Sequence, residues 1–99
     1  MRYDHLGDEA LLELVARRDG AALAALYDRY AAGALAVAVR VTGERAAAEA
    51  AVERLFWSLW RGEVALTGRG LRNSLMLAAR HLAGAPAATV MAPGALAGR

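Results

Sequence analysis

The sequence predicts an all-α protein, a compact bundle of about four helices. In four segments of the 99-residue chain, large apolar side chains recur three and four residues apart, which is the spacing of one buried helix face. Turn signals that contain glycine separate these segments. No partner strand is visible for the one short run of alternating valines, and the absence of cysteine excludes a disulfide framework and a thiolate metal site.

The first predicted helix is short. Asp8, which follows a glycine, offers an N-cap, and apolar residues over 11–15 form one face. The two arginines at 17–18 suit the carboxyl end of a helix, where cations interact favourably with the helix dipole. The Asp-Gly pair at 19–20 then signals a turn.

The second predicted helix begins near Ala21. We expect Gly33 to kink this helix or to break it before residues 34–41. The valines of that second part alternate with alanine, and we assign them to a helix because no partner strand is visible. Gly43 is well placed as a C-terminal cap. The apolar positions at helical spacing are Leu23, Leu26, Tyr27 and Tyr30.

The third predicted helix, over residues 44–61, has a flank that its own core does not explain. Trp57 lies outside the apolar face, one turn after Glu53, and a mixed aromatic and acidic flank suits protein docking. The alternative is that Trp57 simply covers the second helix within the bundle. The apolar face consists of Ala48, Val52, Leu55, Phe56 and Leu59, with Arg54 and Arg61 roughly opposite, facing water. The flank consists of Glu49, Glu53, Trp57 and Trp60.

A polar loop over residues 62–70 precedes the fourth predicted helix, over residues 71–83. From Gly84 onward the chain consists mainly of alanine, glycine and proline and has few large side chains. The sequence therefore predicts one helical domain over residues 1–83, followed by a frayed tail or the start of a linker over residues 84–99.

Charge is unevenly distributed along the chain. Residues 1–60 contain seven arginines and nine acids, a net charge of −2, whereas residues 61–99 contain five arginines and one acid, a net charge of +4. This division indicates an acidic surface for one partner and a basic surface for another. Chance scatter of a few charges is the alternative.

The sequence has no pattern typical of an enzyme or a metal site. His81 has no carboxylate at ligand spacing, and the serines lack a base on a neighbouring turn. Glu49 and Glu53 could form an acid/base pair, but two carboxylates on an exposed flank are more often simply solvated. We predict no enzyme activity, no cofactor and no metal.

The sequence also predicts a cytoplasmic protein without membrane contact. No basic-then-apolar leader is present at the start of these residues, and the longest uncharged apolar run, residues 31–39, is far shorter than the ~20 residues that span a bilayer.

Three segments carry a resemblance to a known family by their order and spacing. They read DEALLELVARRDGAALAALYDRY, RVTGERAAAEAAVERLFWSLWR and LRNSLMLAARHLA. Together, over residues 8–83, they resemble region 2 of the extracytoplasmic-function (ECF) sigma factors of bacterial RNA polymerase, members of the sigma-70 family. The resemblance implies a helical domain whose third helix docks on the polymerase core enzyme. It also implies that the loop and the fourth helix bind the minus-ten element of promoter DNA.

The resemblance assigns residues to both partners. It implies that core polymerase is bound by Glu49, Glu53, Phe56, Trp57 and Trp60. It implies that promoter DNA is bound by Arg69, Arg72, Asn73, Arg80 and His81. This assignment agrees with the division of charge, acidic toward protein and basic toward DNA.

The chain also departs from the family pattern. Ala50 and Arg54 replace family acidic or amide positions, Ser74 replaces a tryptophan, and a basic run after the fourth helix is missing. Region 4, the helix-turn-helix of complete factors, is not among these residues, which favours a diverged stand-alone domain over a fragment. These departures leave open a sigma-like module without promoter activity, which binds an anti-sigma factor, another regulator or a second copy of itself. An unrelated small bundle is a third possibility.

Overall fold

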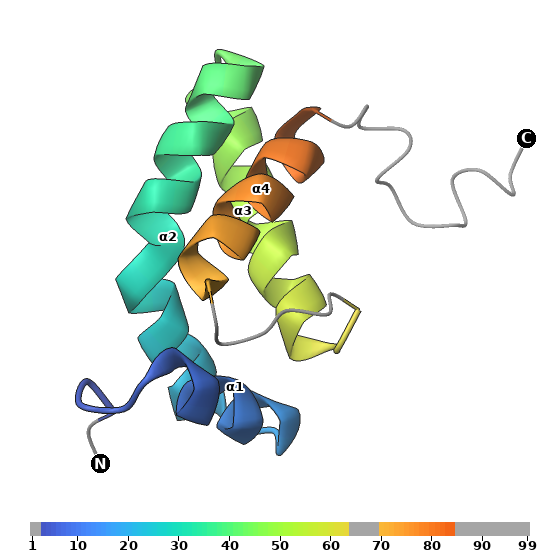
Figure 1. Ribbon diagram of the computed structural model, residues 1–99. Coiled ribbons are helices and arrows are strands. Elements are labelled where there is room, and N and C mark those ends of the chain that lie inside the picture. The colour runs from blue at the N-terminus through green and yellow to red at the C-terminus, as the bar shows by residue number, and fades with distance from the viewer. Residues whose placement is uncertain (1–2, 64–69, 85–99) are drawn as a thin grey trace, which may run out of the picture.

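The computed structural model is a bundle of four helices, which confirms the predicted fold class (Figure 1). It describes residues 3–63 and 70–84, and no strand occurs among them. Helix α2 is the longest and packs against each of the other three helices. In order, the helices are α1 (Asp8–Ala16), α2 (Gly20–Thr42), α3 (Arg45–Trp60) and α4 (Leu71–Gly84).

The turn between α1 and α2 is set by two neighbouring residues. Arg18 adopts a left-handed backbone conformation with φ 66°, which ends α1 and turns the chain toward α2. Asp19 then caps α2, because its carboxylate accepts hydrogen bonds from the backbone N–H groups of Ala21 and Ala22, at 3.0 and 3.3 Å. The helix therefore begins at Gly20, close to the predicted position.

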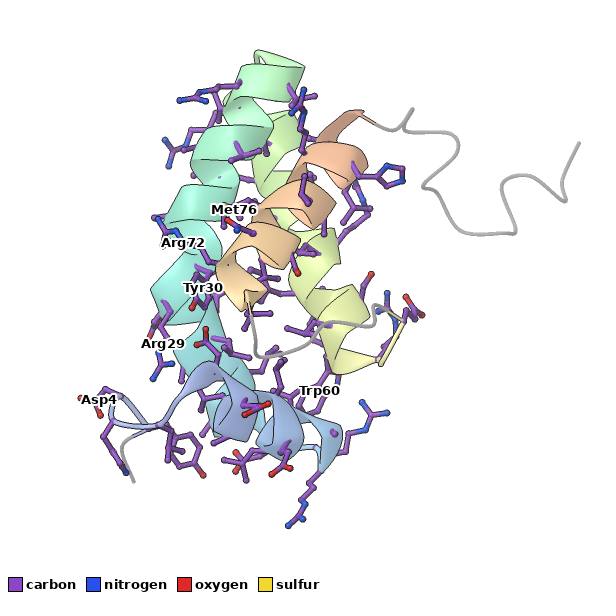
Figure 2. All side chains as sticks on the ribbon, viewed as in Figure 1. Asp4, Arg29, Tyr30, Trp60, Arg72 and Met76 are labelled. Carbon is purple, nitrogen blue, oxygen red and sulfur yellow. The ribbon has the colours of Figure 1, made fainter. Side chains whose placement is uncertain are left out.

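Helix α2 does not break at Gly33, so that part of the expectation is wrong. The helix continues through Gly33 and the valines to Thr42 and ends at Gly43, which has φ 73°. A methyl group at Gly33 would lie 3.5 Å from the sulfur and terminal methyl of Met76 on α4. Such a methyl group would be in ordinary van der Waals contact with Met76, so Met76 packs beside Gly33 without requiring a glycine there; the position of Met76 is labelled in Figure 2.

Alanine contributes more to the core than composition suggests. Alanine buries little area, but six of the fifteen buried core residues among those described are alanine, and they lie on α2, α3 and α4. Small side chains allow these helices to approach closely, while leucines fill the space between them. The largest fully buried side chains are Leu11, Leu26, Leu55, Leu71 and Leu75.

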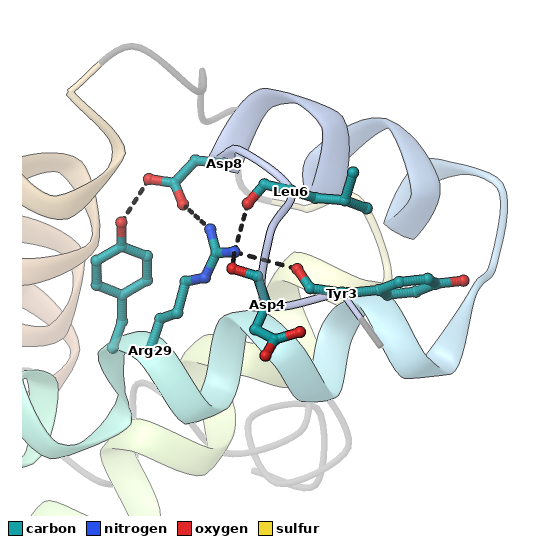
Figure 3. A network of polar contacts seen from close by, with 6 residues as sticks. Tyr3, Asp4, Leu6, Asp8 and Arg29 are labelled. Atoms are coloured by element: carbon teal, nitrogen blue, oxygen red, sulfur yellow. Dashed lines mark hydrogen bonds and ion pairs between the residues drawn. The ribbon is translucent and has the colours of Figure 1, made fainter. Parts of the chain in front are cut away.

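A network around Arg29 fastens the N-terminal segment to α2 (Figure 3). The Arg29 guanidinium forms an ion pair with the Asp8 carboxylate at 2.9 Å. It also donates hydrogen bonds to the backbone carbonyl oxygens of Tyr3, Asp4 and Leu6. The Tyr30 hydroxyl donates to the other carboxylate oxygen of Asp8. Burial and this hydrogen bond raise the pKa of Tyr30 above its ordinary value.

By length and apolar composition alone, α2 could cross a membrane, and it is the one such helix in the described part of the chain. The central helix of a packed bundle has the same properties. The predicted domain boundary at 83/84 falls at the end of α4, whose last residue is Gly84. The predicted tail beyond it, and most of the predicted loop, lie outside the described residues.

Candidate protein- and DNA-binding surfaces

Helices α2 and α3 form an apolar groove with acidic edges. The groove has a volume of about 320 Å³, and its floor and walls are almost entirely apolar. We call it the aromatic–acidic groove and define it by Leu23, Tyr27 and Asp28 of α2 and Glu53, Phe56 and Trp57 of α3.

Trp57 is half exposed at the edge of this groove, with 50% of its surface accessible. Trp57 therefore combines the two alternatives that the sequence left open: one part of the side chain packs beside α2, and the other part is exposed and available for docking. Neither Glu53 nor Asp28 forms an ion pair or a side-chain hydrogen bond with any other described residue. An indole ring and two unneutralised carboxylates are thus available to a partner.

Phe56 does not share this exposure. Only 4% of its surface is accessible, and its ring packs against that of Tyr27 in an edge-to-face arrangement with the ring centroids 5.0 Å apart. Phe56 forms the floor of the groove and supports the exposed side chains. A partner would contact Phe56, as the resemblance implied, only through a side chain that enters the groove.

A second hollow of about 500 Å³ continues the groove along α2 and α3, since Tyr27 and Glu53 line both. Glu49 lies at its edge and forms an exposed ion pair with Arg45 at 2.8 Å. The negative charge of Glu49 is therefore partly neutralised within the chain. Glu53 is the better placed of the two predicted glutamates to attract a basic partner.

Trp60 lies away from this groove, at the end of α3 next to α1 (Figure 2). It is half buried, it packs against the core, and the Arg18 guanidinium lies over its ring at 5.3 Å from the centroid. Arg54, expected to face water, is also half buried, and its Nε is buried without a hydrogen-bond partner in the part of the chain described. Helical periodicity alone therefore placed Arg54 incorrectly.

Helix α4 presents the predicted DNA-binding side chains to solvent. Arg72 and Asn73 are exposed in its first turn, and Arg80 and His81 are exposed near its end. Eight residues of helix separate the two arginines by about 12 Å along the axis. Arg72 lies near Tyr30, and its positive charge, like that of Arg29, opposes the burial and the Asp8 contact that raise the pKa of that hydroxyl (Figure 2). Arg69 lies outside the described residues.

A further surface, which the sequence did not indicate, lies between α2 and α4. It is a hollow of about 400 Å³ where Leu77 is 66% exposed and Val41 is 40% exposed. We call it the basic patch and define it by Val37, Arg40 and Val41 of α2 and Met76, Leu77 and Arg80 of α4. One sequence feature could have predicted this surface: Leu77 is a large apolar residue that lies off the apolar face of its helix, which Leu71, Leu75 and Ala79 form.

Within residues 3–63 and 70–84, no group of three or more His, Asp or Glu side chains is arranged to hold a metal ion. No protein-family model matches the sequence, and neither a curated protein nor a solved structure matches the chain.

Proposed function

We propose that this chain is an ECF-type sigma region 2 domain, which binds the core enzyme of bacterial RNA polymerase and the minus-ten element of promoter DNA. The observation that carries the proposal is the exposure of Trp57 beside Glu53 on α3, at the edge of an apolar groove. The resemblance assigns core binding to this same helix flank.

The physical chemistry of the groove is consistent with a protein partner. Tryptophan is among the residues that dominate binding energy in interfaces, especially in an apolar pocket with a polar rim. Tyr27 and Trp57 provide the exposed aromatic surface, and Asp28 and Glu53 provide the rim. A partner that presents apolar side chains flanked by arginine or lysine would complement both features.

The character of α4 is consistent with DNA binding. The helix contains two arginines and no acid, and its exposed side chains include Asn73 and His81. Arginines position phosphates, whereas Asn and His side chains form hydrogen bonds with the edges of unstacked bases. Two arginines give only weak affinity, since binding to nucleic acid depends strongly on the number of phosphate contacts. DNA binding is therefore expected to be weak without polymerase.

The exposure of Leu77 favours a second candidate function. A leucine with two thirds of its surface in water, on the helix assigned to DNA, suits a protein contact better than a phosphate contact. In that case the chain is a sigma-like module that binds a regulator such as an anti-sigma factor, without promoter activity. Either function belongs in the cytoplasm and requires no cofactor, catalysis or membrane.

The test is binding of the purified chain to the polymerase core enzyme of its own bacterium. Fluorescence anisotropy of the labelled chain is measured against increasing core enzyme. We expect saturable binding that Glu53→Arg weakens at least about tenfold, because reversed charge at an interface repels the complementary partner. Glu13→Arg, which changes an exposed glutamate on α1 by the same charge, is the matched control and should bind like the original chain.

Two outcomes would contradict the proposal. One is a chain that circular dichroism shows to be folded but that does not bind core enzyme at any concentration. The other is equal weakening by Glu53→Arg and Glu13→Arg, which would indicate attraction by net charge rather than docking on α3.

A further inference from the structure

The large exposed apolar side chains of the described residues gather on two surfaces. Four such side chains exist, and each is at least 40% accessible. Tyr27 and Trp57 line the aromatic–acidic groove, and Val41 and Leu77 line the basic patch. Exposed apolar residues scattered singly are ordinary, but residues paired in hollows mark interaction sites.

The two surfaces carry opposite charge. The groove places Asp28 and Glu53 beside its apolar floor, whereas the patch places Arg40 and Arg80 beside its own. None of these four side chains has an ion-pair partner elsewhere in the described residues. Each surface therefore combines an unfilled hollow with two free charges of one sign.

We infer that the chain associates with a second copy of itself, the basic patch of one copy docking in the aromatic–acidic groove of the next. In that contact Leu77 and Val41 of one copy become buried against Tyr27 and Trp57 of the other. The guanidinium groups of Arg40 and Arg80 then face the carboxylates of Asp28 and Glu53 in the partner. Arginine and aromatic residues are the types enriched in interfaces, and this contact brings them together.

The placement of the two surfaces bears on the symmetry of the assembly. The groove lies where α2 meets α3, and the patch lies where α2 meets α4, which crosses in front of α3 in Figure 1. A contact between two different surfaces joins copies in a row or a ring when it is heterologous, and it forms a twofold dimer when both surfaces pair reciprocally with the same partner. The mean mass should therefore rise with concentration, to that of a dimer for reciprocal pairing and beyond it for heterologous pairing.

This inference goes beyond the proposed function and does not depend on it. If the proposed function is also correct, polymerase core and a second copy compete for Trp57 and Glu53. Self-association would then block polymerase binding when the chain is abundant and polymerase is scarce.

The test is sedimentation equilibrium of the purified chain over a wide range of concentration, with no polymerase or DNA present. Two variants reverse one surface each. The patch variant carries Arg40→Glu and Arg80→Glu, and the groove variant carries Asp28→Arg and Glu53→Arg. Each variant alone should associate more than about a hundredfold more weakly, because like charges then face each other.

An equimolar mixture of the two variants provides the decisive measurement. In the mixture the reversed patch faces the reversed groove, and the unaltered patch faces the unaltered groove. Association should therefore return to the level of the original chain. Raising the ionic strength from about 0.1 M to about 1 M shortens the screening length from about 10 Å to about 3 Å, and it should weaken association in both samples.

A control variant with Glu9→Arg and Glu13→Arg has the same net charge as the groove variant, but its changes lie on α1, outside both surfaces. It should associate like the original chain. The inference is overturned if the original chain stays monomeric at its highest soluble concentration, or if the patch variant alone still associates. A mixture that remains monomeric also overturns it. Polymerase binding by the patch variant, measured separately, reports on the proposed function alone.

Discussion

The guanidinium of Arg18 lies over the indole ring of Trp60, 5.3 Å from its centroid, and donates a hydrogen bond to the Trp60 backbone carbonyl oxygen. This contact joins the turn between α1 and α2 to the end of α3, 42 residues later in the chain. It gives Trp60 a partner within the molecule. The two tryptophans of α3, three residues apart, therefore have different roles.

Replacing each tryptophan by alanine should separate these roles. Trp57→Ala should change the free energy of unfolding by less than about 1 kcal/mol, because half of the side chain is already in water, while it weakens partner binding. Trp60→Ala should cost about 1–2 kcal/mol, from lost packing and the lost cation–π contact. Thermal and denaturant unfolding measure both values. A larger loss for Trp57→Ala than for Trp60→Ala would show that Trp57 belongs to the core.

Arg29→Lys should destabilise the protein by about 1–3 kcal/mol. Lysine keeps the charge but cannot reach the Asp8 carboxylate and three carbonyl oxygens with a single ammonium group, and hydrogen bonds to charged groups are the costly ones to lose. Arg45→Lys, in the exposed pair with Glu49, is the control and should change stability by at most about 0.5 kcal/mol. Equal effects in urea unfolding would mean that the network contributes nothing beyond a surface pair.

The bond between Tyr3 and Asp19 should make stability depend on pH. The Tyr3 hydroxyl donates to the Asp19 carboxylate at 2.7 Å, which lowers the pKa of Asp19 below its ordinary 3.8 and raises the pKa of Tyr3 above its ordinary 10.0. A lowered carboxyl pKa stabilises the fold above pH 3.8, and this stability is lost as the pH falls through the folded-state pKa. The raised tyrosine pKa has the opposite consequence: its stability is lost as the pH rises above 10.0.

Tyr3→Phe tests this linkage. The variant should be less stable than the original chain at neutral pH, and its stability should fall less steeply in acid. Asp19→Asn retains a side-chain oxygen that can accept from the N–H groups of Ala21 and Ala22, but its amide does not titrate. This variant should therefore also lose less stability as the pH falls. Urea unfolding between neutral pH and acid measures both. If neither substitution changes how the free energy of unfolding falls in acid, the prediction is contradicted.

Arg72→Ala should weaken binding of a single-stranded minus-ten oligonucleotide and flatten its dependence on salt. Each phosphate contact contributes about 0.7 to the slope of log affinity against log salt for single strands. Arg17→Ala, which removes an exposed arginine directly after α1, should leave the slope as it is. If anisotropy titrations show the same affinity and slope for Arg72→Ala and the original chain, Arg72 is not part of a DNA-binding surface.

The elements of the fold could be predicted from local sequence. Four periodic segments became four helices, with Gly43 ending α2 as expected and Asp19 beginning it through a side-chain cap. The prediction of a break at Gly33 failed because it rested on the low helix propensity of glycine alone. It did not include the packing of Met76, on α4, against this position. Propensity describes a residue alone, whereas tertiary packing decided the outcome here.

The surfaces were harder to predict. On a helical wheel Trp57 and Trp60 lie on the same flank, and tertiary contacts distinguish them: Trp60 packs against the core and under the distant Arg18, whereas Trp57 lines the groove. The basic patch joins Val41 to Leu77, from helices that are far apart in the sequence, and their meeting depends on how α4 crosses α2. Periodicity identifies which face of a helix is apolar, but it does not report where another helix will leave that face uncovered.

The Arg29 network also limits which substitutions this sequence can accept during evolution. Three of the five bonds in that network that involve Arg29 or Tyr30 end on backbone carbonyl oxygens, which every amino acid provides. These three bonds therefore place no demand on the side chains of the residues that provide the carbonyl oxygens, whereas they require the arginine at position 29. Among natural variants of this protein, Arg29 and its carboxylate partner Asp8 should be replaced only together, and Tyr3 and Leu6 should be limited instead by their packing against the core.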